Sequence, residues 1–160
     1  MPQFLPVTCF SATLMLAYCQ HYTCKFLSGR CFSNTHLRQM AAWLSCPPQS
    51  PRSLRQHPTL AAHITLLHAA GLLNHNQVLW YLTPDVFPWL EQPVSTQCAE
   101  LLAGMADGRW AAIIEQYQLT DILTIDVVAY IQQQLLHQVQ QVSPPMSTWL
   151  AGADRNTTAL

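Results

Sequence analysis

Apolar residues recur at helical spacing along most of this chain of 160 residues. That spacing places them on one face of a helix, so the pattern predicts a mainly α protein. The stretch from Leu72 to Leu82 differs, because apolar residues typical of strands flank the turn-forming triplet Asn74-His75-Asn76. It predicts a small β-hairpin. The predicted helices cover about residues 7–21, 35–45, 52–56, 59–70, 85–91, 95–106, 107–118 and 125–142.

Several helix ends carry residues that stop or start a helix. Ser33 to Thr35 offer an N-cap for the second helix, since their side chains accept hydrogen bonds from free backbone N–H groups. Pro47 and Pro48 end that helix. Gly71 is a natural stop for the helix over 59–70, and the chain must reverse there before the hairpin. We therefore expect Gly71 to adopt a left-handed backbone conformation.

The order of these elements divides the chain into four segments. Residues 1–33 form an N-terminal helix and turn, and residues 34–92 contain several helices and the hairpin. Pro93 marks a joint to a helical extension over 93–145. Residues 146–160 are rich in small polar side chains and are expected to form a flexible tail. We expect the segment 34–92 to have a complete core without the extension.

The second segment carries a resemblance to a known family. Arg52 to Gln56, followed by Thr59 to Leu73, resemble the second and third helices of the winged helix-turn-helix family. Tyr81 to Pro84, with Trp89-Leu90 downstream, resemble the return strand of a wing and the helix after it. The resemblance covers about residues 34–90. It implies a winged helix-turn-helix with an added N-terminal helix and a C-terminal helical extension, whose third helix enters the DNA major groove.

The resemblance also indicates which residues would contact DNA. The face of the third helix opposite its apolar stripe carries small side chains and no Arg, Lys, Asn or Gln, the residues that read base edges with two hydrogen bonds. His75 lies in the wing. We therefore expect contacts to phosphates, which position a protein but specify no sequence. The predicted DNA-binding residues are Arg38, Arg52, Arg55, Thr59, Ala62, Thr65 and His75.

The charged side chains are unevenly distributed. Residues 1–84 contain five cations and no Asp or Glu, whereas residues 85–160 contain all eight acids and two cations. Such asymmetry suggests that the first half meets a polyanion. Charged residues make up only 9% of the chain, so self-association or a place in a larger assembly is also expected.

The six cysteines favour reduced thiols. The apolar run over residues 4–19 is short, interrupted by Pro6, and lacks a basic start and a cleavage site, so we expect neither a signal peptide nor a membrane helix. A cytoplasmic location follows by default, and disulfides are rare there. The alternative is a zinc site, which needs four converging soft ligands. Its ligands would be Cys19, Cys24, Cys31 and His36.

The last predicted helix has one apolar stripe flanked by glutamines, and it suits either an intramolecular core or a dimer seam. The stripe consists of Val128, Ile131, Leu135, Val139 and Val142. The sequence contains no Gly-rich phosphate loop, metal-binding His-Glu helix or nucleophile elbow.

We therefore expect a non-enzymatic protein without a cofactor or metal. Its expected role is a small transcriptional regulator, or an accessory subunit of a mobile-element or nucleoprotein complex. It would bind double-stranded DNA and use its C-terminal helices for a protein partner or self-association. The alternative is a protein-docking module in which the winged helix is a scaffold that does not touch DNA.

Overall fold

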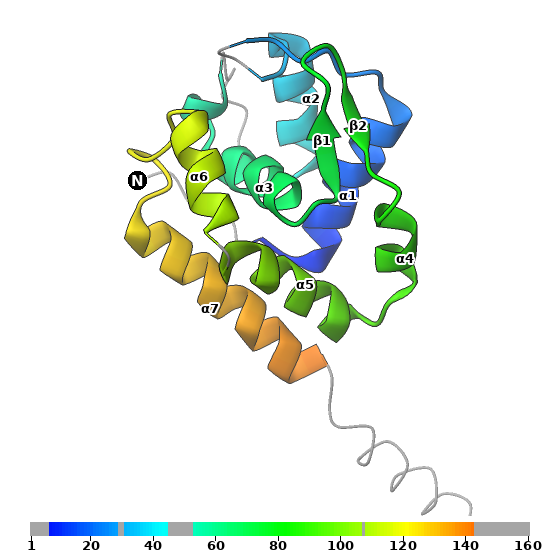
Figure 1. Ribbon diagram of the computed structural model, residues 1–160, viewed down its shortest axis with the longest axis vertical. Coiled ribbons are helices and arrows are strands. Elements are labelled where there is room, and N and C mark those ends of the chain that lie inside the picture. Colours follow the sequence, from blue (N-terminus) through cyan, green and yellow to red (C-terminus); the bar gives the residue numbers. More distant parts are fainter. Residues whose placement is uncertain (1–6, 29–30, 45–52, 107, 143–160) are drawn as a thin grey trace, which may run out of the picture.

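The computed structural model describes residues 7–28, 31–44, 53–106 and 108–142. These residues form a mainly helical structure with one two-stranded antiparallel sheet (Figure 1). The predicted tail over 146–160 lies outside the described residues. The elements are α1 (Cys9–His21), α2 (Asn34–Trp43), the short 3-10 helix η1 (Leu54–Gln56), α3 (Pro58–Ala69), β1 (Leu73–His75), β2 (Trp80–Leu82), α4 (Val86–Glu91), α5 (Val94–Ala106), α6 (Arg109–Gln116) and α7 (Ile125–Val142).

Each predicted helix is present, and its ends lie within about two residues of the predicted positions. Local hydrogen bonds explain this agreement. Thr8 and Ser11 form a capping box at the start of α1, in which each side chain accepts from the backbone N–H of the other. Ser33 Oγ accepts from the His36 N–H at the start of α2. Pro58 occupies the first turn of α3, where a proline costs no hydrogen bond.

The predicted hairpin is also confirmed. Strand β1 pairs with β2 in antiparallel register, with Leu73 opposite Leu82. Asn76 Oδ1 accepts from the N–H groups of Val78 and Leu79, at 3.0 and 2.8 Å, and this fixes the turn. Residues 24–26 lie against the hairpin at strand β2, because the N–H of Trp80 donates to Cys24 O over 2.9 Å. The hairpin is therefore anchored to the segment that follows α1.

Gly71 has the expected left-handed conformation, with φ of +77°. A Cβ built there would have no atom within 4 Å, so any penalty for a side chain comes from the backbone alone. We predict that Gly71→Val lowers the free energy of unfolding by about 1–3 kcal/mol, because β-branched residues are strongly disfavoured at positive φ. Urea titration measures this change. Gly71→Asn is the matched control and should lose less, since Asn tolerates this conformation; equal stability of the valine variant would contradict the prediction.

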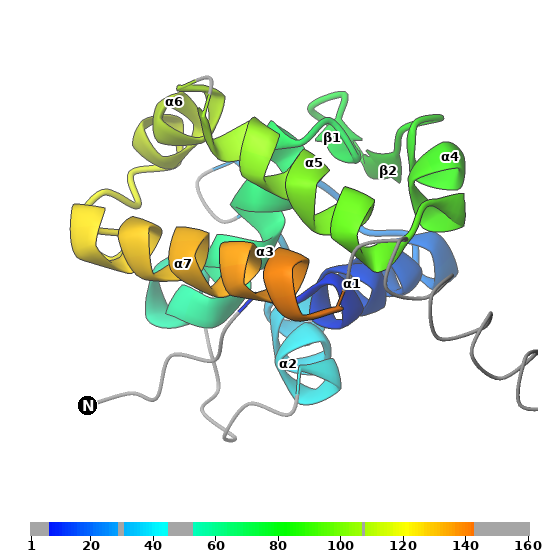
Figure 2. The same cartoon turned by 90° about the horizontal axis from the view of Figure 1, so that it is seen from below.

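Helix α3 lies at the centre of the molecule. In Figures 1 and 2 the other helices surround it, and α1, α5, α6 and η1 all pack against it. All of its residues except Pro58 and His68 are buried. An enclosed helix differs from the exposed third helix that the family resemblance implies.

The hydrophobic core is continuous across Pro93. One cluster includes Leu60 and Ile64 of α3 together with Leu101 of α5 and Trp110 of α6. A hydrogen bond of 2.8 Å from Trp110 Nε1 to Thr65 Oγ1 joins the same elements. Residues 34–92, which were expected to have a complete core of their own, thus share their core with side chains from beyond Pro93 that cover α3.

Helix α7 packs along α5 (Figure 2). Of its predicted apolar stripe, Ile131 and Leu135 are buried, and Val128 and Val139 are half-buried against the core. The side chain of Val142 lies outside the described residues. The stripe is thus an intramolecular seam, and the four described residues are not available as a dimer seam.

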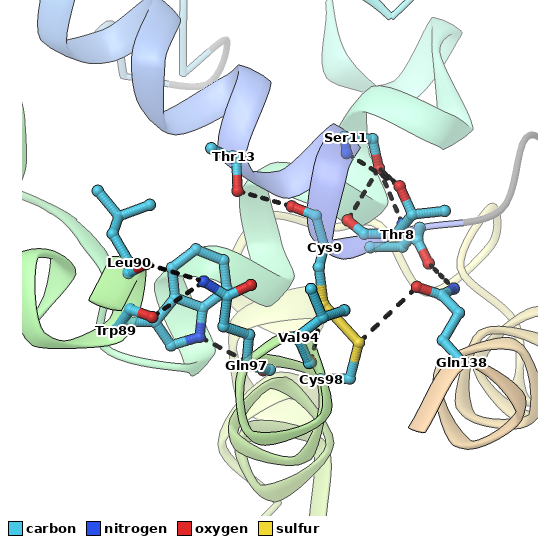
Figure 3. The surroundings of a disulfide bond; sticks show 11 residues. Thr8, Cys9, Ser11, Thr13, Trp89, Leu90, Val94, Gln97, Cys98 and Gln138 are labelled. Atoms are coloured by element: carbon cyan, nitrogen blue, oxygen red, sulfur yellow. Dashed lines mark hydrogen bonds between the residues drawn. A yellow bond between two sulfur atoms is a disulfide. The ribbon is translucent and has the colours of Figure 1, made fainter. Parts of the chain in front are cut away.

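A disulfide joins Cys9 of α1 to Cys98 of α5, with 6.2 Å between their Cα atoms (Figure 3). The expectation of reduced thiols is wrong for this pair. Gln138 of α7 lies beside the bridge, and its Nε2 donates to Val7 O over 3.1 Å. These contacts fix the start of α1, the start of α5 and the end of α7 together. Among the described helices, none combines the length and the apolar character needed to cross a bilayer.

Candidate nucleic-acid interface

The three predicted contact residues of α3 are inside the protein. Thr59 is 4% exposed, and Ala62 and Thr65 are fully buried. The small side chains leave room for neighbouring helices to approach, so this face of α3 is packed rather than open to solvent. The hydroxyl of Thr65 donates to Ala61 O over 2.7 Å and accepts from Trp110. Thr59, Ala62 and Thr65, which were expected to contact DNA, are thus enclosed in this structure and do not reach its surface.

The predicted cations differ in their surroundings. Arg38 is exposed on α2. Arg55 is held by the loop before α7, because its guanidinium donates to Gln118 O over 2.7 Å and forms an ion pair with Asp121. Arg52 lies outside the described residues. The sequence analysis did not select Lys25, which is exposed beside the hairpin.

His75 uses its ring for internal contacts. Its Nδ1 accepts from the Gln77 N–H at 3.1 Å, so Nε2 carries the proton and donates to Tyr117 Oη at 2.9 Å. The ring stacks on Phe26, with 3.8 Å between centroids. Burial lowers the pKa of His75, which keeps the imidazole neutral. His75 borders a cavity of about 360 Å³, but its own hydrogen bonds hold it in place as a structural group.

The four residues of the zinc alternative are not brought together. Among the described residues, no three His, Cys, Asp or Glu side chains are placed to hold a metal ion. Tyr18 Oη accepts from His36 Nδ1 over 2.6 Å. A hydrogen bond with Cys24 raises the pKa of Cys19 and lowers that of Cys24, and burial raises the pKa of Cys31 to about 12.

A group of aromatic side chains forms the surface between α1 and α2, which we call the α1/α2 aromatic face. Tyr18 lies at its base with no exposed surface, and Tyr22 and Trp43 are each 36% exposed. The rings of Tyr18 and Trp43 are perpendicular, with 5.1 Å between centroids. His21 packs edge-on against Tyr22 at 4.6 Å. The residues of this face are Tyr18, His21, Tyr22, His36 and Trp43.

Hydrogen bonds at the base of this face fix its geometry. Tyr18 Oη donates to Gln39 Oε1 over 2.7 Å and accepts from His36. Burial raises the pKa of Tyr18, so the hydroxyl keeps its proton and this donation persists at ordinary pH. The sequence analysis missed this face, although Tyr18 lies in the last turn of α1 and Tyr22 is the residue that follows this helix.

The segments of the chain that carry the α1/α2 aromatic face also carry two exposed cations. Lys25 follows Tyr22 by three residues, and Arg38 lies on α2, the same helix as Trp43. The first 84 residues contain no Asp or Glu. The part of the chain that builds this face therefore contributes positive charge and no negative charge.

A second cavity, of about 330 Å³, lies at the end of α3 beside α4, α5 and α6. Its wall includes the carboxylates of Asp85 and Glu100 and the guanidinium of Arg109, all on exposed residues. Charges of both signs on an open surface do not indicate one class of ligand. The α1/α2 aromatic face is the more specific arrangement. No family model matches this chain, and no curated protein or solved structure matches it.

Proposed function

We propose that this chain is a non-enzymatic DNA-associated protein that contacts phosphates and reads no sequence. The role would be that of a small transcriptional regulator or an accessory subunit of a mobile-element or nucleoprotein complex. The observation that carries this proposal is the separation of charge. Exposed Lys25 and Arg38 belong to a half of the chain without a carboxylate.

The enclosed position of α3 determines how DNA would be contacted. A helix whose faces are covered by α1, α5 and α6 cannot enter the major groove without unfolding part of the core. The resemblance to winged helix-turn-helix proteins, which supports this proposal through the order of elements, therefore does not extend to base reading. Phosphate contacts remain, and they supply affinity that depends on salt.

Salt titration tests the proposal. For duplex DNA, each phosphate contact adds about −0.9 to the slope of log K against log salt. The double variant Lys25→Ala, Arg38→Ala should therefore flatten that slope by about two units, because both contacts are removed. Fluorescence anisotropy with labelled duplexes of unrelated sequence measures it.

Arg109→Ala is the matched control, since it removes a cation from the acidic half and should leave the slope unchanged. Binding that does not change with salt, or that the double variant retains in full, would rule out the phosphate contacts.

A protein-docking module is the second candidate. It is favoured by large apolar side chains exposed near the disulfide-linked ends of α1 and α5. Phe10 is 74% exposed, Phe87 of α4 is 63% exposed, and Leu90 and Val94 are 43% and 40% exposed. Exposed apolar residues in a group are typical of surfaces that meet another protein. Sedimentation of the chain alone separates self-association from a foreign partner.

The proposal includes the cytoplasmic location expected from the sequence. Thiols are kept reduced in the cytoplasm. The Cys9–Cys98 disulfide is therefore an observation against a cytoplasmic location, although not against DNA binding.

A further inference from the structure

We propose that a second copy of this chain covers the surface formed by the hairpin and helix α4, in a dimer with two-fold symmetry. We call this surface the hairpin/α4 face. Its residues are Lys25, Leu79, Tyr81, Phe87, Leu90 and Glu91. The dimer goes beyond the proposed function, and only its competition with DNA rests on that function.

The sheet contributes three side chains to this face. Lys25 lies opposite Leu79 in an antiparallel bridge, and side chains directly opposite each other project from the same face of a sheet. Tyr81 is two residues after Leu79, so it projects from that face too. The other face of the sheet is turned inward, because Trp80 is buried and α1 packs against β2. Lys25 is exposed, and Tyr81 is 41% exposed.

Helix α4 continues the same surface. Figures 1 and 2 both show the hairpin and α4 side by side at the edge of the molecule. Val86 and Trp89 are buried and hold α4 against the core. Phe87 and Glu91, four residues apart, therefore point outward together. Phe87 is 63% exposed and Leu90 is 43% exposed, so exposed apolar side chains extend from the sheet onto α4.

The two charges of this face lie at opposite ends of it. Lys25 lies beside the start of β2, and Glu91 is the last residue of α4. The chain runs from the hairpin turn through Tyr81 into α4, which leads away from that turn (Figure 1). Among the described residues, neither Lys25 nor Glu91 takes part in an ion pair. Both charges are thus available to a partner.

This arrangement selects a second copy as the partner. In a two-fold interface, residue i of each copy meets residue j of the other. A two-fold axis through the apolar middle brings Lys25 of each copy to Glu91 of the other. A uniformly basic or uniformly acidic partner would instead meet a like charge at one end, which opposes binding. The middle supplies Tyr81 and Phe87, and aromatic side chains are enriched in the interfaces between proteins.

The dimer and DNA would compete for Lys25. In the proposed function this side chain contacts a phosphate, which it cannot do while it is paired with Glu91 of the other copy. Because linkage is reciprocal, a ligand that binds the monomer better than the dimer shifts the equilibrium toward the monomer. Duplex DNA is therefore expected to raise the apparent dissociation constant of the dimer.

Sedimentation velocity over a concentration series, without nucleic acid, tests the dimer. Phe87→Ser should raise its dissociation constant about a hundredfold, because each dimer buries two of these rings. Lys25→Glu and Glu91→Lys should each raise it about tenfold, because two pairs of like charges then face each other. The double variant Lys25→Glu, Glu91→Lys should restore the dimer, since each pair again has opposite charges.

Arg38→Glu is the matched control. It changes the net charge by the same amount as Lys25→Glu, but it lies on α2, which Figure 2 shows on the opposite side of the molecule from the hairpin and α4. The dissociation constant of this variant should equal that of the wild type. Urea titration of each variant confirms that it is folded.

Each outcome decides for or against the dimer. A dimer that both single reversals weaken and the double variant restores supports it; if that dimer binds no DNA, only the proposed function is lost. A chain that stays monomeric yet binds DNA in a salt-dependent way overturns the dimer and leaves the proposed function standing. Open-ended assemblies, or a dimer that the face variants do not weaken, also overturn it.

Two further results would contradict specific parts of the arrangement. A duplex that binds the dimer without raising its dissociation constant overturns the pairing of Lys25 with Glu91. A monomeric full chain beside a dimeric chain that ends at Val142 overturns the second copy as the natural occupant, and it assigns the hairpin/α4 face to residues 143–160 instead.

Discussion

A chain that ends at Gln92 is expected to be unfolded in buffer. Its α3 would lose the cover of α5 and α6, which pack against it in the full chain. The buried side chains that would be removed include Leu101, Trp110 and Ile114, and each buried aliphatic or aromatic side chain stabilises a fold by about 1.5–3 kcal/mol. The net stability of a domain is only about 5–15 kcal/mol. Far-UV circular dichroism and amide proton dispersion measure the outcome.

The matched control for this truncation is a chain that ends at Val142. It keeps α1 to α7 and the disulfide between Cys9 and Cys98, so it should unfold cooperatively with a midpoint close to that of the full chain. A cooperative urea transition for residues 1–92 alone would show that the core does divide at Pro93.

Acid is expected to destabilise the protein through His63. This side chain is buried on α3, where Nδ1 donates to Thr59 O over 2.7 Å and Nε2 accepts from the Ser11 hydroxyl at 2.7 Å. Burial lowers the pKa of His63 to about 4. The unfolded chain therefore binds a proton near pH 6.5 that the folded chain does not yet bind. The contribution of His63 to stability is complete above that pH and is lost as the pH falls toward 4.

The size of this effect follows from the difference in pKa. At 1.36 kcal/mol for each pKa unit, His63 accounts for about 3 kcal/mol between pH 6.5 and 4. Urea titrations at a series of pH values measure the slope. His63→Gln should be less stable at neutral pH but should show a flatter dependence on pH over this range. His137→Gln, at an exposed position of α7, should follow the wild-type curve; an identical pH dependence of the His63 variant would exclude this role.

The secondary structure could be predicted because its signals are local. The cap at Ser33 and the glycine after α3 each act within a few residues. These groups satisfy the free N–H and C=O groups of a helix end wherever the helix is placed. The hairpin and the left-handed Gly71 follow from the same local chemistry.

The environment of α3 could not be predicted in this way. A helical wheel separates large apolar side chains from polar ones, but Thr59, Ala62 and Thr65 are small and occur equally on exposed and on tightly packed faces. Their burial depends on α5 and α6, which come more than 25 residues later in the chain. The partner of Cys9 lies 89 residues away, and the ion pair of Arg55 lies 66 residues away. No local sequence pattern predicts contacts between residues so far apart in the chain.

The α1/α2 aromatic face was missed for a related reason. Tyr18 and Tyr22 lie at the end of α1 and directly after it, but His36 and Trp43 belong to the next helix. Their meeting depends on how α1 and α2 cross. The charge asymmetry, by contrast, was evident in the sequence, because it needs no knowledge of which segments lie side by side.

The central position of α3 also has a consequence for biosynthesis. The helix is made early, but α6, one of the helices that cover it, ends only at Gln116. At a synthesis rate of about 5–20 residues each second, the ribosome needs several seconds to extend the chain from Ala69 to that point. During this interval Leu60, Ile64 and Leu67 lack part of their cover. The nascent chain therefore presents an apolar helix to chaperones in the cell before it can fold.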